Sequence, residues 1–431
     1  MSVLTVAYML ALIDRQILGL LVAPIKISLM LTDTQLGFLM GPAFAIFYVI
    51  LGWPIGWMAD RMNRRNIVAT SIALWSLMTA LCGLTRSFWQ LFVARIGVGV
   101  GEAALTPTVL SLVSDLFSPR QRASAIVIYM AGIPLGIGLA YLCGGWLSRV
   151  TLVSGLSIPL LHDLRSWQMA FIAVGLSGLP ISLMVLRIRE PARQRASQGT
   201  RVSSRATLAQ MATQWRAYAA LAIGMCPVTT IAYGAGWNAT LFQRVWGWPV
   251  SRSGLWIGLT YLVCGPLGAL ISSLANDKLA ARGYADAAYR AGALGILVLV
   301  VSATLYPLAP SPQFALMLNV FSVAGNAFAS GMGAAAIVAL APTAYRAQTA
   351  AIYLMLINLV GLMLGPPLIG WLSDHFYRDV SGVGPAMATV AASAGIPALT
   401  ILWMGRRSYR AALPLEKLPN QRFAGNGAVS A

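Results

Sequence analysis

Charged side chains are scarce in this sequence. Asp, Glu, Lys and Arg make up only 10% of its 431 residues and hydrophobic residues make up 58%, whereas a soluble globular domain carries about 25% charged residues. This composition excludes a soluble domain and predicts an all-α membrane protein with many spans. The net charge of +18 does not indicate nucleic acid binding, because the basic residues fall in short clusters between apolar runs.

Cysteine and histidine are also scarce, which limits the available chemistry. The 4 cysteines lie in apolar runs without C-x-x-C spacing, so neither a disulfide framework nor a zinc site is indicated. The 2 histidines, His162 and His375, fall near predicted loops, which argues against a metallohydrolase or a haem protein. No Walker A sequence is present, which excludes direct use of ATP. We expect no metal, no cofactor and no enzymatic activity.

Long apolar runs cover most of the chain. A helix needs about 20 mostly apolar residues to cross a bilayer, and twelve runs meet this condition. Met1 leads almost directly into the first run without a basic region or a cleavage site, so we expect no cleaved signal peptide and a few further residues upstream. The predicted spans are 2–23, 35–59, 67–86, 90–114, 122–147, 167–188, 216–243, 253–275, 291–309, 313–340, 348–373 and 386–405.

Basic residues gather in every second connection between these runs. The connections after the second, fourth, sixth, eighth and tenth spans, together with the C-terminal tail, hold most of the 30 Lys and Arg residues. Because Lys and Arg are enriched in cytoplasmic loops, we predict that both termini and the connection over 188–215 face the cytoplasm. The expected location of this multi-pass protein is the inner membrane of the cell.

The two halves of the chain resemble each other. Gly145–Ser148 and Gly370–Ser373 both read GWLS, and Arg122–Tyr129 (RASAIVIY) resembles Arg346–Tyr353 (RAQTAAIY) at nearly the same offset. Matches at one offset indicate a duplicated six-span unit. We therefore predict two pseudo-symmetric six-helix bundles. The predicted parts are an N-terminal bundle over 1–187, a cytoplasmic linker over 188–215, a C-terminal bundle over 216–405 and a cytoplasmic tail over 406–431.

Four charged residues lie well away from the ends of predicted spans, and a charge costs about 3 kcal/mol at the bilayer centre. Asp14 and Arg15 belong to the first span, and Arg95 and Glu102 to the fourth. Arg95 and Glu102 are seven residues apart and share a helix face, with three intervening glycines that let a neighbouring helix approach. We predict that Glu102 accepts a proton when Arg95 is engaged elsewhere, with Asp14 as a third member. A static ion pair that joins the two spans is the alternative, and Arg15 either reaches the pathway or snorkels.

The second half offers polar and aromatic groups in place of these charges. The repeat maps Glu102 onto Asn319 or Asn326 in the tenth span. Each such group also fits simple packing or a bond to neighbouring backbone. A cavity with charge on one side and aromatic walls on the other suits an amphipathic substrate. The predicted cavity residues are Phe44, Tyr48 and Tyr129 of the first half and Tyr233, Trp237, Asn238, Asn319, Asn326, Tyr353 and Asn358 of the second.

The connection between the second and third spans carries a specific motif. Gly56–Arg65 reads GWMADRMNRR and resembles the G-x-x-x-D-R-x-G-R-R signature of the major facilitator superfamily. Asn63 replaces the inner glycine, and Asn tolerates the same left-handed turn. We predict that this motif and its weaker counterpart between the eighth and ninth spans control the conformational cycle; a solvated loop that only sets topology is the alternative. The predicted gate residues are Gly56, Asp60, Arg61, Arg64, Arg65, Asp277, Lys278 and Arg282.

Further segments resemble the Spinster branch of this superfamily. They are Asp14–Ile17, Ala94–Ala103, Gly132–Gly136, Gly144–Leu147 and Gly365–Asp374, and the resemblance covers nearly the whole chain apart from the linker and the tail. It implies a twelve-helix transporter that works by alternating access, in which Asp14, Arg15, Arg95 and Glu102 form a charged cluster that responds to protons and substrate. Eukaryotic members of the branch export sphingosine-1-phosphate or lysophospholipids.

The sequence as a whole predicts a proton-coupled secondary transporter for a small, amphipathic or lipid-like organic solute. Uptake of a small organic anion with Arg95 as the carboxylate clamp is one alternative. A non-coupled lipid scramblase or a sensor on the same scaffold is another, against which the paired buried charges argue. The expected partners are protons, membrane lipids and a small-molecule or lysolipid-like substrate, with the protein as a monomer and no nucleic acid.

Overall fold

The computed structural model describes residues 1–59, 61–153, 164–190 and 204–413. Over these residues the regular structure is helical and contains no strand. The predicted all-α fold with twelve transmembrane helices is confirmed, because each predicted span overlaps one stretch long and apolar enough to cross a membrane. These stretches are 2–20, 33–52, 64–82, 88–116, 120–147, 166–186, 215–246, 250–281, 287–308, 312–340, 348–377 and 380–412.

Several crossings are built from two or more helices. The first half contains α1 (Ser2–Leu20), α2 (Val22–Leu29), α3 (Asp33–Met40), α4 (Pro42–Ala59), α5 (Arg64–Cys82), α6 (Phe88–Glu102), α7 (Leu105–Leu116), α8 (Pro119–Met130), α9 (Gly132–Val153) and α10 (Ser166–Leu186). The second half contains α11 (Ser204–Thr213), α12 (Trp215–Gly234), η1 (Ala235–Trp237), α13 (Asn238–Trp246), α14 (Val250–Ala281), α15 (Ala287–Leu305), η2 (Tyr306–Leu308), α16 (Pro312–Leu340), α17 (Arg346–Leu372), η3 (Ser373–Tyr377), η4 (Val380–Gly382) and α18 (Val383–Ala412).

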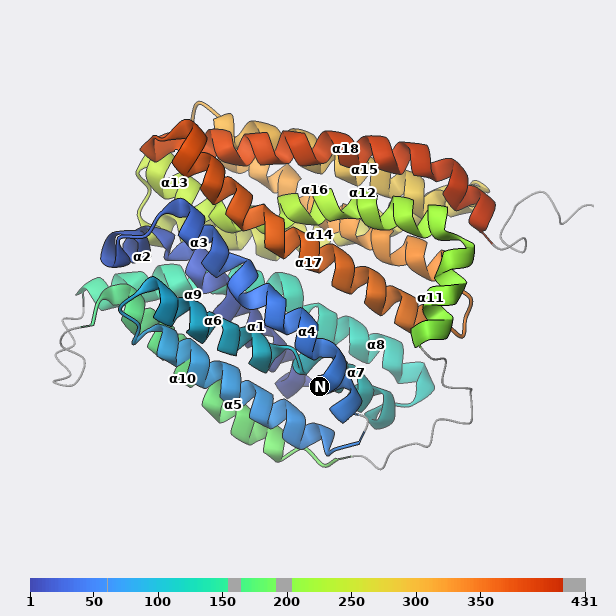
Figure 1. Ribbon diagram of the computed structural model, residues 1–431, viewed down its shortest axis with the longest axis horizontal. Coiled ribbons are helices and arrows are strands. Elements are labelled where there is room, and N and C mark those ends of the chain that lie inside the picture. Colours follow the sequence, from blue (N-terminus) through green and yellow to red (C-terminus); the bar gives the residue numbers. More distant parts are fainter. Residues whose placement is uncertain (60, 154–163, 191–203, 414–431) are drawn as a thin grey trace, which may run out of the picture.

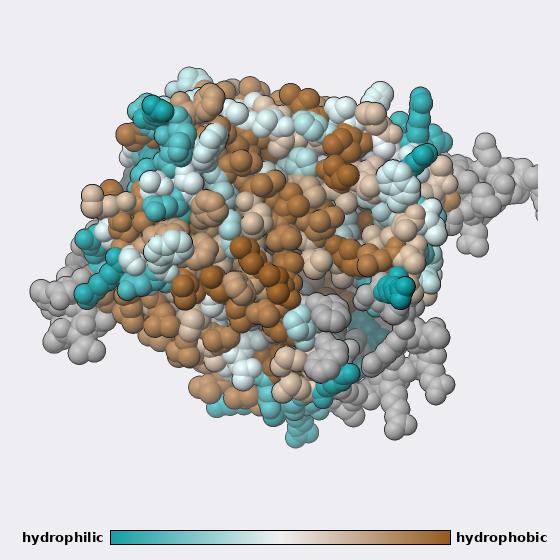
Figure 2. Space-filling model, viewed as in Figure 1, coloured by the Kyte–Doolittle hydropathy of each residue, from teal (hydrophilic) through white to brown (hydrophobic). Residues whose placement is uncertain are grey.

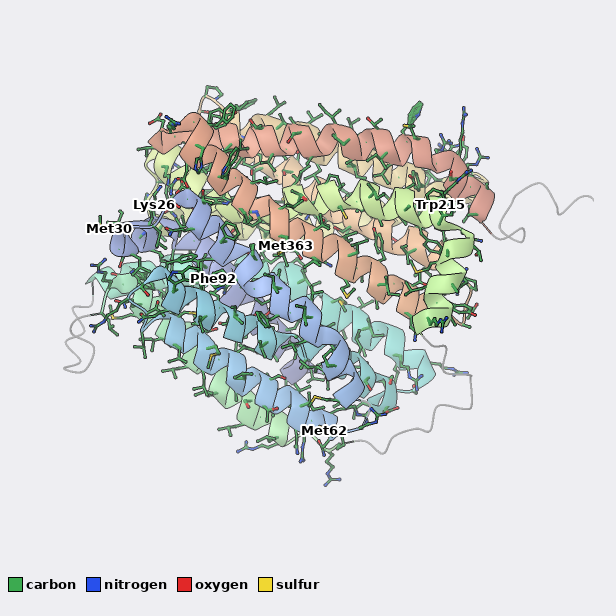
Figure 3. All side chains as sticks on the ribbon, viewed as in Figure 1. Lys26, Met30, Met62, Phe92, Trp215 and Met363 are labelled. Atoms are coloured by element: carbon green, nitrogen blue, oxygen red, sulfur yellow. The ribbon has the colours of Figure 1, made fainter. Side chains whose placement is uncertain are left out.

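The helices form two bundles that meet at one end (Figure 1). The N-terminal bundle consists of α1–α10 and the C-terminal bundle of α12–α18. The bundles lie together at the end with α2, α3 and α13, called the α3 end below, and diverge toward the end with α7, α8 and α11, called the linker end. In Figure 3, Lys26 and Met30 mark the α3 end, and Met62 and Trp215 mark the linker end. The linker predicted over 188–215 includes 191–203, which lie outside the described residues, so the exact boundaries stay a prediction.

The molecular surface agrees with a position inside a bilayer. Figure 2 shows apolar residues across the middle of the visible face, with hydrophilic residues gathered toward its margins. Large hydrophobic side chains such as Trp89, Leu183 and Trp403 are more than half exposed. A soluble protein does not expose apolar surface on this scale, so we expect lipid to surround the apolar middle of the molecule.

The eighth crossing is longer than the sequence predicts. Asp277 and Lys278, predicted to lie in a loop, belong to the last turn of α14, where both are exposed. The helix continues because no glycine or proline interrupts the chain between Leu270 and Arg282. Gly283 ends it, with φ of 82°, a conformation that glycine adopts without strain.

Glycines let α6 lie close to its neighbours, as the sequence predicts. A Cβ on Gly99 would meet the backbone oxygen of Phe44 in α4 at 2.5 Å, and one on Gly101 would meet the backbone nitrogen of Trp75 in α5 at 2.7 Å. Small residues permit such close backbone approach in membranes. As a result, the C-terminal turns of α6 bring Glu102 into the centre of the N-terminal bundle.

Candidate functional site

Arg15 and Glu102 form a buried ion pair between α1 and the end of α6. Arg15 Nη2 lies 2.6 Å from Glu102 Oε2, and the two side chains are 16% and 2% exposed. Arg15 Nε and Glu102 Oε1 have no hydrogen-bond partner among the described residues. The pair therefore keeps capacity to bind one more polar group.

This pairing corrects the prediction that Arg95 is the partner of Glu102. Two residues seven apart on a helix share a face but lie about 10 Å apart along its axis. Arg95 instead donates to the backbone oxygens of Leu39 at 3.4 Å and Asp14 at 3.3 Å. Arg15 of α1, whose guanidinium group reaches Glu102, takes the place predicted for Arg95, so Arg15 points inward and does not snorkel.

Phe44 of α4 lies close to both guanidinium groups. The Arg15 Cζ atom is 4.1 Å from the ring centroid of Phe44, and the Arg95 Cζ atom is 5.8 Å from it. Tyr48, one turn further along, has its ring centroid 5.3 Å from Arg15 Cζ. A cation over an aromatic face gains about 0.5–2 kcal/mol, most when it is desolvated. The aromatic face of α4 thereby holds both arginines in place.

Asp14 lies behind this pair, inside the N-terminal bundle. It is fully buried, and Arg95 is 1% exposed. Neither carboxyl oxygen of Asp14, nor Arg95 Nη2, has a hydrogen-bond partner among the described residues. Buried carboxyl groups without partners are rare because desolvation is costly. The four predicted charged residues are thus brought together as two couples. Arg15 and Glu102 form an ion pair, and Arg95 donates to the backbone oxygen of Asp14.

Tyr233 of α12 brings the C-terminal bundle into the cluster. Its hydroxyl donates to Asn358 Oδ1 of α17 at 2.7 Å, and it lies within electrostatic range of Arg15. On the opposite wall, Tyr8 and Tyr129 stack with their centroids 4.6 Å apart. Of the predicted cavity residues, Phe44 and Tyr48 therefore contact Arg15, Tyr129 and Tyr233 lie near the ion pair, and Asn358 bonds Tyr233.

The other predicted cavity residues lie apart from Arg15. Asn238 Nδ2 donates to Asn319 Oδ1 at 3.3 Å, and the Tyr306 hydroxyl donates to Asn238 Oδ1 at 2.5 Å. Trp237 Nε1 donates to the backbone oxygen of Pro366 at 3.1 Å. These contacts join helices of the C-terminal bundle to one another. Tyr353 is buried within that bundle and Asn326 is half-buried.

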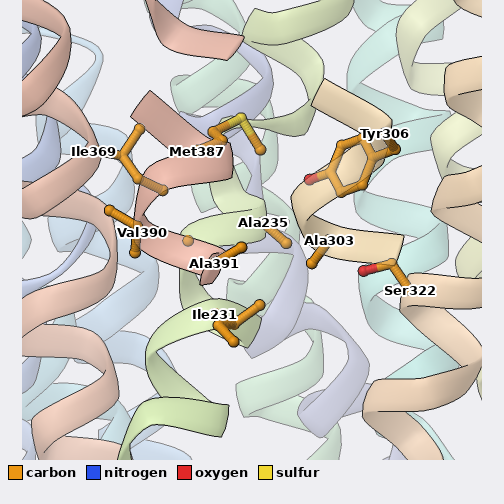
Figure 4. A pocket seen from close by; sticks show the side chains of 10 residues that line it. Ile231, Ala235, Ala303, Tyr306, Ser322, Ile369, Met387, Val390 and Ala391 are labelled. Carbon is orange, nitrogen blue, oxygen red and sulfur yellow. The ribbon is translucent and has the colours of Figure 1, made fainter. Parts of the chain in front are cut away.

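A small pocket lies in the C-terminal bundle beside this network (Figure 4). Apolar side chains such as Ile231, Met387 and Val390 line it, and Tyr306 and Ser322 are its polar members. No charged residue is among those that line it. The pocket is therefore a poor candidate for coupling chemistry, in contrast to the cluster around Arg15.

The predicted gate motif forms a network at the linker end within the N-terminal bundle. Arg64 of α5 is 2% exposed, bonds Asp115 of α7, and donates from Nε to Glu190 Oε1 at 2.9 Å. Burial alone would raise the pKa of the Glu190 carboxyl. Hydrogen bonds from the Arg65 backbone and the Arg64 side chain outweigh burial and hold that pKa below its usual value. Gly56 lies on α4, Asp60 lies outside the described residues, and Arg61, Asp277, Lys278 and Arg282 are exposed.

A network at the α3 end was not predicted from the sequence. Asp33 begins α3 and is 2% exposed. Its carboxylate accepts hydrogen bonds from Arg244 Nη1 and Nη2 of α13 at 2.6 and 2.8 Å, and from Lys26 Nζ at 2.6 Å. Ser373 of the C-terminal bundle donates to the same carboxylate at 2.8 Å. Asp33 therefore connects the two bundles.

Asp374 makes a reciprocal connection. Its carboxylate accepts from the backbone nitrogens of Asp33 and Thr34 at 3.0 and 2.6 Å, and from the Thr34 hydroxyl at 2.7 Å. A carboxylate at a helix N-terminus satisfies free N–H groups and complements the helix dipole. Here the C-terminal bundle caps a helix of the N-terminal bundle. The only sequence signal was Asp374 at the end of a span, next to the repeated GWLS segment.

The fold and the cluster define a polytopic membrane protein of the transporter type, and sequence comparison identifies its family. Residues 4–285 match the Major Facilitator Superfamily, so the chain belongs to that family. The predicted resemblance to the Spinster branch is confirmed. Mouse protein spinster homolog 1 is 34% identical over 153 residues, which cover 35% of this chain and 26% of the mouse protein.

Two further comparisons extend over almost the whole chain. The crystal structure of a bacterial homologue of the human lysosomal transporter Spinster, in an inward-facing and unoccupied conformation, has a TM-score of 0.81 and 26% identity and covers 95% of each chain. An MFS-type efflux pump of Mycolicibacterium smegmatis is 27% identical over 410 residues, which cover 92% of this chain and 90% of that protein.

Proposed function

We propose that this protein is a proton-coupled secondary transporter that moves a small, amphipathic organic solute across the inner membrane by alternating access. The observation that carries the proposal is the Arg15–Glu102 pair at 2.6 Å, located where Tyr233 of the other bundle approaches. Any solute that passes between the bundles meets this pair.

Coupling follows from the cost of an unpaired buried charge. A solute anion that draws Arg15 away leaves Glu102 alone in a site where its side chain is 2% exposed. Removing one partner of a buried pair costs about 3–5 kcal/mol, and a carboxylate escapes that cost by taking up a proton. Solute binding and proton uptake at Glu102 thereby favour each other. Asp14, whose carboxyl has no partner among the described residues, is the second proton-binding group.

The chemistry of the walls supports an amphipathic solute. Arg15 and Glu102 offer charge at one point, whereas Phe44, Tyr48 and Tyr233 surround that point with aromatic surface. A solute with a charged or polar head and an apolar body satisfies both parts. The resemblance to the Spinster branch, whose eukaryotic members export sphingosine-1-phosphate or lysophospholipids, supports this class of solute.

Alternating access is supported by the unequal packing of the two ends. At the α3 end, Asp33 and Asp374 bond across the bundles, and the bundles diverge toward the linker end. The positive-inside rule assigns the linker end to the cytoplasm. The conformation is then inward-facing, as in the similar bacterial Spinster homologue.

A ligand screen tests the proposal across several classes of solute. Thermal unfolding of the purified protein is measured with lysophospholipids, sphingoid bases and organic acids at pH 6 and pH 8. We expect stabilisation by an amphipathic compound that differs between the two pH values in the wild type and not in Glu102→Gln. Stabilisation that is independent of pH in both proteins would contradict proton coupling.

A small organic anion is the second candidate. It is favoured by Arg15 Nε, which is buried without a hydrogen-bond partner among the described residues, because a carboxylate accepts two parallel bonds from a guanidinium group. A probable L-galactonate transporter of Escherichia coli, 24% identical over 287 residues, is among the similar proteins. Stabilisation by organic acids alone in the same screen would favour this candidate. A scramblase, in contrast, would dissipate a lipid gradient and never build one.

A further inference from the structure

Unsatisfied polar atoms gather behind Asp14 on one face of α5. Trp75 and Thr79 are 0% and 1% exposed, and both face the Asp14 carboxyl. The Trp75 indole nitrogen, the Thr79 hydroxyl and both Asp14 oxygens lack a hydrogen bond of ordinary length and angle among the described residues. Two donors and one acceptor thus share a buried space without being satisfied.

Helix packing explains why these groups are confined together. A Cβ on Gly101 of α6 would overlap the backbone of Trp75, and one on Gly175 of α10 would overlap the backbone nitrogen of Ala80. Glycines on both flanking helices therefore let α5 pack closely against α6 and α10. Trp75 and Thr79 are four residues apart, which places them on the same helix face. The position of this face is set by backbone contact and not by flexible side chains.

We propose that Trp75 and Thr79 are positioning residues that set the pH at which Asp14 releases its proton. This proposal rests on the proposed role of Asp14 in proton coupling. An indole N–H donates only, and a hydroxyl donates to a carboxylate. Both groups stabilise the ionised form of Asp14 when they bond it, and neither makes a hydrogen bond of ordinary length and angle to it here. A small movement of α5 relative to α1 therefore makes or breaks the bonds that favour proton release.

Other ionisable groups around Asp14 do not duplicate this role. α10, which also packs on α1, has no ionisable side chain between Ser166 and Leu186. Tyr141 of α9 stacks on Tyr261 of the other bundle, and Cys143 is exposed, so neither side chain is directed toward Asp14. Among the side chains that the structure describes, the charged or titratable groups that face Asp14 or lie on the elements packed around α1 are Tyr8, Arg15, Lys26, Asp33, Cys82, Arg95, Glu102, Arg120, Arg122, Tyr129, Tyr141, Cys143 and Arg244.

Infrared spectroscopy tests the proposal without a known solute. The carbonyl band of a protonated carboxyl that is present in the wild type and absent in Asp14→Asn is followed against pH in the full-length protein in lipid. We expect Thr79→Val and Trp75→Phe each to move its midpoint to higher pH by about one unit, a tenfold change in proton binding. Thr79→Ser, which keeps the hydroxyl, should restore the wild-type midpoint.

A neighbouring hydroxyl supplies the matched control. Ser76 of α5 is buried and unpartnered among the described residues, but its Oγ faces Gly178 of α10, where a Cβ would overlap it. Ser76→Ala should leave the midpoint unchanged. Equal midpoints in the wild type, Thr79→Val and Trp75→Phe would overturn the inference and leave the role of Asp14 intact. The absence of any titrating band assignable to Asp14 would instead overturn the proposed role of Asp14 and, with it, this inference.

Discussion

Arg244 of the C-terminal bundle holds Asp33 of the N-terminal bundle through two parallel hydrogen bonds of 2.6 and 2.8 Å. Both side chains are largely buried, at 10% and 3% exposure. Bidentate bonds of this kind are among the strongest between side chains. Because the two residues are 211 positions apart and lie at the end where the bundles meet, they form a latch that must open whenever the α3 end opens.

Removal of the latch should favour the conformation that is open at the α3 end. Arg244→Ala leaves Asp33 with Lys26 as its remaining basic partner, and we expect a population shift of about tenfold, since a hydrogen bond to a charged group contributes about 1.5–3 kcal/mol. Spin labels at Met30 and Val380, which are both exposed at this end, report the distance between the bundles in a Cys143→Ser background.

A nearby arginine controls for the loss of charge. Arg252 lies over the Trp248 ring at 4.3 Å, and among the described residues no hydrogen bond or ion pair joins it to the N-terminal bundle. Arg252→Ala should leave the distance distribution unchanged. The latch is wrongly assigned if Arg244→Ala and Arg252→Ala give the same distribution as the wild type.

Close backbone contact at the α3 end predicts a second shift in the same direction. A Cβ on Gly41 would overlap the backbone oxygen of Leu362 in α17, whereas one on Gly52 of α4 would meet nothing within 4 Å. Gly41→Val should therefore prevent closure at this end, and Gly52→Val should not. The same pair of spin labels measures both variants, and similar distances in the two would show that the glycine contact is not needed for closure.

Asp286 at the linker end predicts a pH-dependent stability. It accepts from Arg406 at 2.6 Å and from Arg290 at 2.9 Å. Burial alone would raise the pKa of Asp286, but these bonds outweigh it and the pKa lies below its usual value. A carboxyl with a lowered folded-state pKa stabilises the fold above its unfolded value of about 3.9, and the stabilisation is lost as pH falls through the folded value.

Asp286→Asn should accordingly unfold a few degrees below the wild type at pH 7, and the difference should shrink as pH falls below about 3.9. Both arginines are about one third exposed, which limits the effect. Thermal unfolding in detergent measures it, with Asp277→Asn, an exposed residue of α14, as the control. A constant difference between Asp286→Asn and the wild type from pH 7 to pH 3 would exclude the linkage.

The spans were predictable from the sequence because burial in lipid leaves a long apolar run, and the charged cluster because charges in such runs are rare. The partner of Glu102 could not be predicted from the sequence, since the choice between Arg15 and Arg95 depends on how α1 and α6 are aligned. The periodicity of apolar residues shows which face of each helix is buried, but it does not show how far one helix is shifted along its axis relative to another. The Asp33–Arg244 contact was also hidden, because both residues lie at span ends, where charge is ordinary.

Local sequence also explains why Asp277 and Lys278 were predicted in a loop although they lie in α14. Asp277 and Lys278 look like a loop because charged residues usually end a span. The chain nevertheless stays helical through Ala281, since Leu, Ala and Lys favour helix and the first glycine or proline after Leu270 is Gly283. Helix length and membrane thickness are separate quantities, so a helix can extend past the apolar region into water.

The most direct test of the account is solute accumulation in proteoliposomes driven by an imposed pH gradient, with the compound that gives the largest stabilisation in the thermal screen as the transported probe. One coupled proton per solute allows at most about tenfold accumulation for each pH unit. The account predicts accumulation above the external concentration in the wild type, and equilibration without accumulation in Glu102→Gln and Asp14→Asn. Flux that is indifferent to the gradient in the wild type and unchanged in Glu102→Gln would contradict it.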